Sequence, residues 1–187
     1  MVNLDGPDGC QYYWHDIRRE PEKFSKRVLG GGSVVVWAAV AANGKSKIAI
    51  LEGKQDSSKY IETLKEFLLP FVEEVRPKMA PMMPVFQQDG ASIHTTGVTK
   101  AFLQDQRLSV MEWPAKSPDL NIIENVWGLL ARSVYEDGRQ FDSRASLIQQ
   151  IQKCWDQIGM SYLQRLVDDM PTRIAEVILK KGARIDR

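Results

Sequence analysis

Two acidic residues, Asp89 and Glu124, combine a residue type and a position that suit metal-assisted chemistry. Asp89 follows a short apolar run, Val85-Phe86, and is followed by Gly90, so we expect a buried strand that carries the carboxylate at its C-terminal tip. Open α/β sheets keep their sites at such strand tips. Asp89 is therefore the first candidate site residue.

Glu124 belongs to a segment that carries the signals of a helix start. Ser117 is a suitable N-cap, Pro118 suits the first helical position and Asp119 suits the first turn, so we expect a helix from about Pro118. Apolar residues at three- and four-residue steps would face the core and leave Glu124 at the edge of their stripe. The stripe consists of Leu120, Ile123, Trp127, Leu130 and Val134.

Packing this helix on the sheet would bring the two carboxylates together. Carboxylate oxygens are the hard ligands that Mg²⁺ and Mn²⁺ prefer. Two such ions about 3.5–4 Å apart can stabilise both the attacking and the leaving oxygen in phosphoryl transfer. Each acid alone has a common structural explanation, because aspartate often closes a turn and a first-turn glutamate interacts with the helix dipole. Together, Asp89 and Glu124 predict metal-dependent phosphoryl transfer.

Both segments resemble the catalytic core of the mariner superfamily of DNA transposases, in the nematode-type branch whose catalytic triad is Asp-Asp-Glu. The resemblance is carried by Gln88-Asp-Gly-Ala-Ser-Ile-His94 and by Trp113-Pro-Ala-Lys-Ser-Pro-Asp-Leu-Asn-Ile-Ile-Glu-Asn-Val-Trp127, and the 34 residues between the two acids match that branch. Further matches extend it over essentially the whole chain. They are Asn3-Leu-Asp-Gly-Pro-Asp-Gly9, Gly30-Gly-Gly-Ser-Val-Val-Val-Trp37 and Met170-Pro-Thr-Arg173.

The resemblance implies a ribonuclease-H-like α/β fold and a single catalytic domain over residues 1–187. An intact relative would use two Mg²⁺ or Mn²⁺ ions to activate water for cleavage at transposon ends, and then a 3′-hydroxyl for strand transfer. Asp89 and Glu124 would be its catalytic residues and metal ligands. Its partners would be the terminal inverted repeats of the transposon, the target DNA and a second copy of the chain, and its location would be the nucleus.

The sequence also departs from the family pattern. The first catalytic aspartate and the helix-turn-helix DNA-binding region are expected before the position at which this sequence starts. Asp5 and Asp8 lie in the turn that follows the opening strand and do not match the catalytic position. Gly90 replaces the usual asparagine, and Ile122 replaces the usual proline. An alternative therefore stays open, in which the chain is a catalytically silent, domesticated or decayed transposase that binds nucleic acid or a protein.

Three further residues are candidates for contact with nucleic acid. His94 matches the histidine of the family five residues after Asp89, although an ordinary surface histidine explains it equally well. Lys116 and Ser117 border the expected helix start, where backbone N–H groups can bind phosphate. Basic residues of the C-terminal helices, Arg173 among them, could line DNA, but a solvated helix face explains most of them.

The bulk composition is that of a soluble globular domain, with 43% hydrophobic and 26% charged residues in a chain of 187. The formal net charge is only +1, so DNA would have to bind through a local patch. Cys10 and Cys154 form no Cys-x-x-Cys pair, which argues against a zinc site or a disulfide framework. No signal peptide and no run of about 18 apolar residues is present, so we expect an intracellular protein.

The first half of the sequence predicts a hairpin and a long helix. Residues 33–40 have the β-branched composition of a strand buried on both faces, and residues 47–51 return beside it after a turn at Asn43-Gly44. A helix capped by Ser57-Ser58 should run to Pro77. Its aromatic side chains, which include Tyr60 and Phe71, are best explained by packing on the sheet.

The second half predicts a strand and mostly helices, which completes an α/β pattern. A short helix capped by Thr95 or Thr96 should precede a strand at residues 108–113. Further amphipathic helices should begin near Ser143 and Ser161, and Pro171 should separate the last of them. The whole order indicates a mixed sheet whose first strands are joined by hairpins and whose later strands alternate with helices.

Overall fold

Strand β2 (Ser33–Trp37) lies at the centre of the structure, a computed structural model that describes residues 2–3, 33–114, 117–183 and 185. β2 pairs antiparallel with β1 (Val2–Asn3) and with β5 (Ala49–Leu51), and Val36 lies opposite Ile50. The motif Asn3–Gly9 and the glycines 30–32 therefore lie largely outside the described residues.

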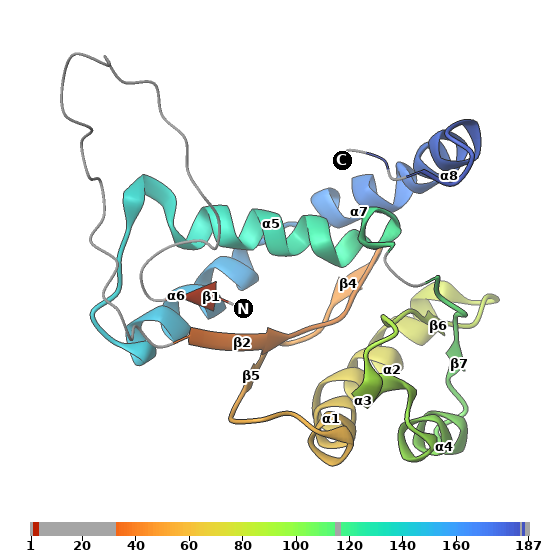
Figure 1. Cartoon of the computed structure of the whole chain (residues 1–187), viewed down its shortest axis with the longest axis horizontal. Helices are drawn as coiled ribbons and strands as arrows, with labels where there is room; N and C mark the ends of the chain where they lie inside the picture. Colours follow the sequence, from red (N-terminus) through yellow and green to blue (C-terminus); the bar gives the residue numbers. More distant parts are fainter. Residues whose placement is uncertain (1, 4–32, 115–116, 184, 186–187) are drawn as a thin grey trace.

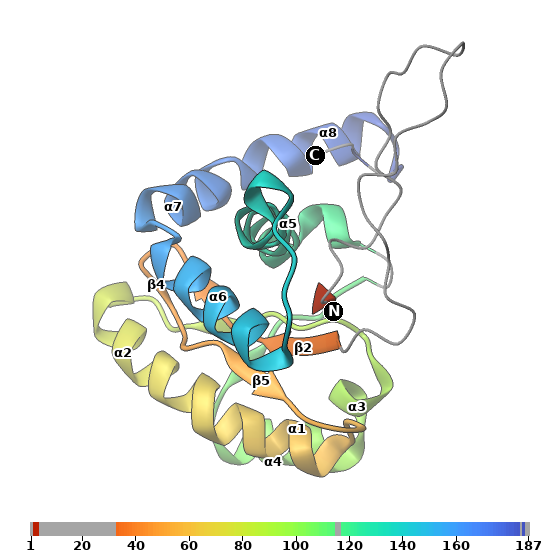
Figure 2. The ribbon, with the colours of Figure 1, turned by 90° about the vertical axis from the view of Figure 1, so that its left-hand side faces the viewer.

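The two faces of β2 pack against different cores, as the prediction of a doubly buried strand requires. Val34 and Val36 pack against the first core. The helices α5 (Ile122–Val134), α6 (Arg144–Gln157) and α7 (Met160–Asp168) complete this core. Trp37 packs against the second core, which is built from the helices that follow β5 and from α4 (Gly97–Asp105). Figures 1 and 2 show β2 between these helix layers.

The predicted strand 33–40 is interrupted after Trp37. Ala39 donates its backbone N–H to the hydroxyl of Ser46 at 2.9 Å, and the N–H of Ser46 donates to the carbonyl of Ala39 at 2.8 Å. A second small hairpin then forms from β3 (Val40–Ala41) and β4 (Gly44–Lys45). Gly44 is needed there because a Cβ atom would lie only 2.8 Å from the ring of Phe71.

One long helical segment follows β5 and begins at α1 (Ser57–Thr63). It continues through a π-helical turn (Leu64–Leu68) into α2 (Leu69–Met79). The predicted cap was wrong by one residue: Asp56 accepts a hydrogen bond from the N–H of Lys59 at 2.9 Å, because its extended backbone and short carboxylate suit the N-cap. The helix also continues past Pro77, whose fixed φ is compatible with a helix and whose missing N–H costs one bond.

The segment that carries Asp89 begins with β6 (Val85–Phe86), which pairs parallel with β7 (Ser109–Val110). Between them lie α3 (Ser92–Thr95) and α4 (Gly97–Asp105), and Thr96 caps α4. β6 covers the predicted run Val85-Phe86, whereas β7 is much shorter than the predicted strand 108–113. The strand was also predicted to be buried, but Val85 is 50% exposed because only Phe86 turns toward the second core.

The rest of the chain is helical, as predicted. It contains η2 (Pro118–Leu120), α5 (Ile122–Val134), η3 (Glu136–Gly138), α6 (Arg144–Gln157), α7 (Met160–Asp168) and α8 (Met170–Leu179). Ser143 forms a capping box with Ser146 at the start of α6. Pro171 lies in the first turn of α8, where its missing N–H leaves no helical bond unmade. None of the helices in the described ranges is long and apolar enough to cross a membrane.

Lys45 joins the β3–β4 hairpin to the end of α6. Its Nζ donates to the carbonyl oxygens of Trp155, Asp156 and Ile158 at 2.5, 2.9 and 2.7 Å. The indole Nε1 of Trp155 donates in return to the carbonyl of Ser46 at 2.9 Å. Burial lowers the pKa of Lys45, and the charge of Asp156 partly offsets this effect. The last carbonyls of α6 thus find a cationic donor, which helix ends favour.

Candidate active site

Asp89 lies in the turn between β6 and α3, where local hydrogen bonds hold its carboxylate. Oδ1 accepts the N–H of Ala91 at 3.0 Å, and the imidazole Nδ1 of His94 lies 2.5 Å from the same oxygen. The side chain of Asp89 is 65% exposed, whereas that of His94 is 17% exposed. His94 is therefore packed behind the carboxylate, which keeps an open face.

A second layer of contacts supports His94. The ring of Tyr60 lies against the imidazole, and its hydroxyl donates to Oε1 of Gln88 at 2.7 Å. The amide nitrogen of Gln88 donates to the carbonyl of His94 at 3.3 Å. The helix α1 thus reaches the site through Tyr60, which we expected only to fill the core.

Glu124 lies in the first turn of α5, as predicted, but the helix begins later than expected. Pro118 starts a separate 3₁₀ turn, and Asn121 follows it in an extended conformation (φ −100°, ψ 109°). The side chain of Asn121 accepts the N–H of Ile123 at 3.3 Å, so Asn121 is the N-cap in place of Ser117. The extended residue separates the two helical segments, because its ψ lies far from the helical value.

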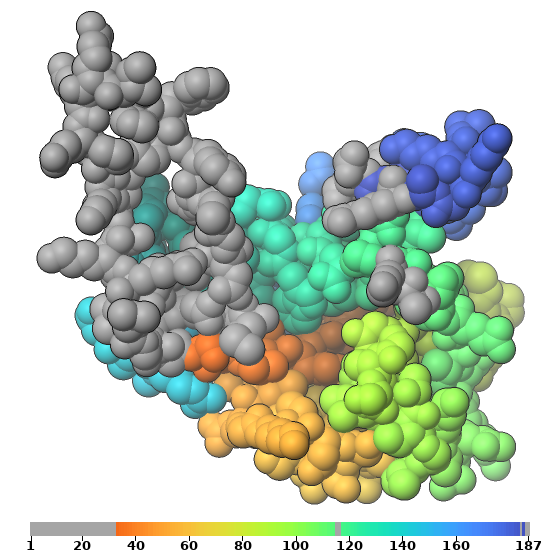
Figure 3. Space-filling model, in the orientation of Figure 1, coloured from red at the N-terminus to blue at the C-terminus, as the bar shows by residue number. Residues whose placement is uncertain are grey.

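Asp89 and Glu124 line one cavity of about 320 Å³, together with Ser117, Asn121 and Trp113. The two acids come from opposite sides of β2, because Asp89 is carried by the second core and Glu124 by the first. Figure 3 shows the light-green α3 segment and the green start of α5 on the same face of the molecule. The cavity therefore has a carboxylate from each side.

The electrostatics of the cavity agree with this proximity. Partial burial raises the pKa of Glu124, and the negative charge of Asp89 raises it further. Burial also raises the pKa of Tyr60, again with a contribution from Asp89. Two carboxylates that repel each other in a shared cavity favour a proton or a cation between them.

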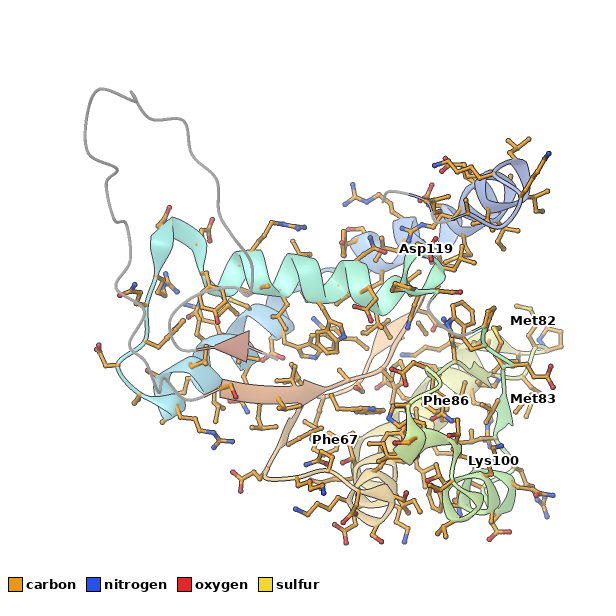
Figure 4. The ribbon with its side chains drawn as sticks, in the orientation of Figure 1. Phe67, Met82, Met83, Phe86, Lys100 and Asp119 are labelled. Atoms are coloured by element: carbon orange, nitrogen blue, oxygen red, sulfur yellow. The ribbon has the colours of Figure 1, made fainter. Side chains whose placement is uncertain are left out.

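A larger cavity of about 460 Å³ lies on the other side of Asp89. His94, Lys100 and Trp113 are among the residues that line it, and Lys100 is labelled in Figure 4. It combines an aromatic ring and one cationic side chain with the carboxylates of Asp89 and Glu112. Of the predicted nucleic-acid contacts, His94 and Ser117 reach the two cavities, whereas Lys116 lies outside the described residues.

Sequence reasoning missed the polar residues behind the two acids. Gln88 stood in a quoted motif without a role, and Asn125 stood directly beside Glu124. Arg173, proposed as a DNA-lining or solvated residue, is only 3% exposed and was therefore placed on the wrong side of its helix. Its place in the Met170–Arg173 match was the one available signal.

Within the described ranges, no group of three or more His, Cys, Asp or Glu side chains is arranged to hold a metal ion. Among the described residues that line the 320 Å³ cavity, Asp89 and Glu124 are the two that carry carboxylates. This donor set fits a hard divalent cation in part, because such sites are usually completed by further oxygen ligands and water.

Comparison with known proteins matches residues 2–148 to a family model described as a DDE superfamily endonuclease. The transposase of the transposable element Tc3 of Caenorhabditis elegans is 41% identical over 180 residues, which cover 96% of this chain and 54% of that protein. The transposase of Tcb1 of Caenorhabditis briggsae is 32% identical over 183 residues, which cover 96% and 65%. The chain thus spans between about half and two-thirds of these relatives.

Solved structures of similar fold include the catalytic domain of the Mos1 mariner transposase. It superposes with a TM-score of 0.72 at 18% identity, over 82% of this chain and 76% of that one. The Mos1 paired-end complex with the left transposon end has a TM-score of 0.79 at 15% identity, over 99% and 54%. The likeness confirms the predicted ribonuclease-H-like fold.

Proposed function

Because this chain belongs to the DDE superfamily endonucleases, as its resemblance to mariner-type transposases predicted, we propose that residues 1–187 form the catalytic domain of a DNA transposase. Asp89 and Glu124 are its acidic catalytic residues. One observation carries the assignment: two acids with 34 residues between them, on opposite sides of β2, line the same cavity.

Asp89 and Glu124 would hold a divalent cation, Mg²⁺ or Mn²⁺. Burial raises the pKa of Glu124, and repulsion by Asp89 raises it further; a bound cation would relieve this repulsion. The Mos1 catalytic domain has been solved with Mn and with Mg, which supports this choice of metal. When bound, such an ion supplies charge stabilisation to a phosphoryl group under attack. By the family pattern, two ions would be held with the help of a further carboxylate on the opening strand.

The residues of this chain position the acids and the DNA. His94 and the N–H of Ala91 orient Asp89, and Asn121 caps the helix that presents Glu124. Ser117 lines the cavity next to η2, where a DNA phosphate would pass. Lys116, which lies outside the described residues, is proposed as a further phosphate contact from the sequence alone. The DNA would be transposon ends and target DNA, handled by a pair of chains in the nucleus. The Mos1 paired-end complexes support this choice of partner.

The first test maps metal binding in the 187-residue chain by NMR. Mn²⁺ should broaden the backbone amide signals of Asp89 and Glu124 at the same concentrations, because one ion would contact both side chains. Asp89→Asn and Glu124→Gln should each weaken the broadening at both positions. Broadening that affects one position alone, or that survives both substitutions, would reject the assignment.

The second test measures catalysis on transposon-end DNA. We would join this chain to the N-terminal part of the Tc3 transposase and follow Mn²⁺-dependent nicking of Tc3 ends. Asp89→Asn and Glu124→Gln should each reduce nicking by about 100-fold or more, as expected when a transition-state contact is lost. Glu66→Gln, an exposed acid in the π-helical turn, is the control. Specific DNA binding without any nicking would favour the silent-remnant alternative.

A further inference from the structure

The C-terminal helices α7 and α8 lie beyond residues 2–148, the part that the family model matches. They nevertheless contact the 3₁₀ turn η2 and the first turn of α5, the two segments around Glu124. Arg173 in α8 is the centre of these contacts and is only 3% exposed. A guanidinium so deeply buried is costly unless all its neighbours are arranged to bind it.

Three hydrogen bonds define what Arg173 holds. Its Nε donates to Oδ2 of Asp169 at 2.9 Å, which supplies the opposite charge from one turn earlier. Its Nη1 donates to Oδ1 of Asn125 at 2.8 Å and to the backbone carbonyl of Asp119 at 3.2 Å. One planar fork thus joins α8 to the 3₁₀ turn and to the first turn of α5.

Two other contacts secure the same segments from the C-terminal side. The hydroxyl of Tyr162 in α7 donates to the backbone carbonyl of Asn125 at 3.2 Å. The backbone N–H of Ile185 donates to Oδ2 of Asp119 at 3.0 Å. Figure 4 labels Asp119 in the turn that precedes α5, close to the C-terminal helices. Both ends of the segment 119–125 are therefore held by residues after position 160.

We propose that Arg173 is a positioning residue for the active site, which holds Asn125 and the 119 turn so that the neighbouring Glu124 faces Asp89. The inference rests on the proposed function of Glu124. Arg173 acts through Asn125, since its hydrogen bonds go to Asp169, Asn125 and Asp119. Glu124 itself lines the cavity. A lysine could pair with Asp169 but lacks the planar fork that reaches both segments.

The test uses the same Mn²⁺ broadening experiment on the 187-residue chain. In Arg173→Gln, the amides of Asp89 and Glu124 should both need roughly 10- to 100-fold more Mn²⁺ to broaden, the usual effect of removing a group that orients a ligand. Arg173→Lys should keep the fold, and the Mn²⁺ concentration that it needs for broadening should lie between those of wild type and Arg173→Gln. Equal broadening of Glu124 in wild type and in a folded Arg173→Gln would overturn the inference.

Asn125→Ala provides a second route to the same answer if Arg173→Gln does not fold. It removes the acceptor and leaves the charge pair of Arg173 with Asp169, so it should also raise the Mn²⁺ concentration that broadens the Asp89 and Glu124 signals. Ile151→Val is the control, because it lowers stability in the first core without touching the 119–125 segment. If Ile151→Val shifts the Glu124 signal as much as Asn125→Ala, a general loss of stability explains the result and the positioning role fails.

The outcomes separate this inference from the proposed function. Wild-type broadening that ignores Asp89→Asn and Glu124→Gln contradicts the proposed metal site. Broadening that depends on both acids but is indifferent to Arg173 and Asn125 contradicts only the positioning role.

Discussion

The ring of Tyr60 lies against the imidazole of His94, with 4.1 Å between the ring centroids and 32° between the ring planes. The hydroxyl of Tyr60 donates to Gln88, and His94 contacts Asp89. Tyr60 is itself buried in the second core. A residue of α1 therefore connects the packing of that core to the orientation of the first acid.

Tyr60→Phe should separate the hydroxyl from the ring. The ring contact with His94 remains, while Gln88 loses a buried donor, so the free energy of unfolding should fall by about 1–2 kcal/mol. Tyr60→Leu should cost more, because it also removes the aromatic surface. Urea denaturation measures both changes. Equal stability of wild type and Tyr60→Phe would show that the hydrogen bond contributes nothing.

Asn121 should be required for the start of α5. Asn121→Ala removes the acceptor for the N–H of Ile123 and should lower the free energy of unfolding by about 1 kcal/mol. Asn121→Asp keeps an acceptor of the same shape and should recover most of that loss. Thermal denaturation of the three proteins tests the ranking, and an alanine variant as stable as the aspartate variant would contradict the cap.

Because the pKa of Glu124 is raised, Glu124→Gln should increase the free energy of unfolding in the absence of metal, by an amount that depends on pH. At a pH below the unfolded-state pKa the carboxyl is protonated in both states and costs nothing. As the pH rises from there through the folded-state pKa, the folded protein holds the proton more tightly than the unfolded chain, so stability falls. Glu124→Gln removes this loss and should therefore stabilise the protein at pH 7 more than at pH 4.

Asp89→Asn supplies the control for this pH effect. It removes the charge that contributes to the raised pKa of Glu124 and leaves the effect of burial in place. The stabilisation gained from Glu124→Gln at pH 7 should therefore be smaller in the Asp89→Asn background. Denaturation curves at a series of pH values provide the comparison, and a gain that grew as the pH fell would have the wrong sign.

Lys45→Met should uncouple the β3–β4 hairpin from α6. Methionine keeps much of the apolar stem but leaves three backbone carbonyls without their cationic donor, so we expect a loss of about 2 kcal/mol. Lys47→Met is the matched control, since Lys47 is an exposed residue two positions along the same chain segment. Hydrogen exchange at the end of α6 should rise only in Lys45→Met, and equal behaviour of the two variants would contradict this role.

The sequence predicted the parts of the structure that local patterns determine. The β-branched run at residues 33–37 forms the central strand, and the spacing of apolar residues located every long helix. The acids Asp89 and Glu124 could be selected because their segments combine a residue type with a turn or a helix start. That they line one cavity follows from the way two cores pack on one strand. Their catalytic and metal-binding roles stay predictions.

The missed features depend on contacts between distant segments. Tyr60 has the spacing of a core residue, and nothing in the helix pattern shows that its hydroxyl meets Gln88. Arg173 has the charge of a surface residue, and its burial results from the packing of α8 against the 3₁₀ turn. The π-helical turn between α1 and α2 likewise has no local signal, because propensities for neighbouring helical forms overlap.

The residues that flank the two acids pack against opposite faces of the same strand, β2. Phe86 and Ile93, which flank Asp89, are anchored beneath one of its faces, and Ile123 and Trp127, which flank Glu124, are anchored above the other. The volume of the side chains on either face of β2 therefore influences the distance between the two carboxylates. Enlarging or trimming Val36 or Trp37 would therefore change the separation of the two carboxylates without altering either acid.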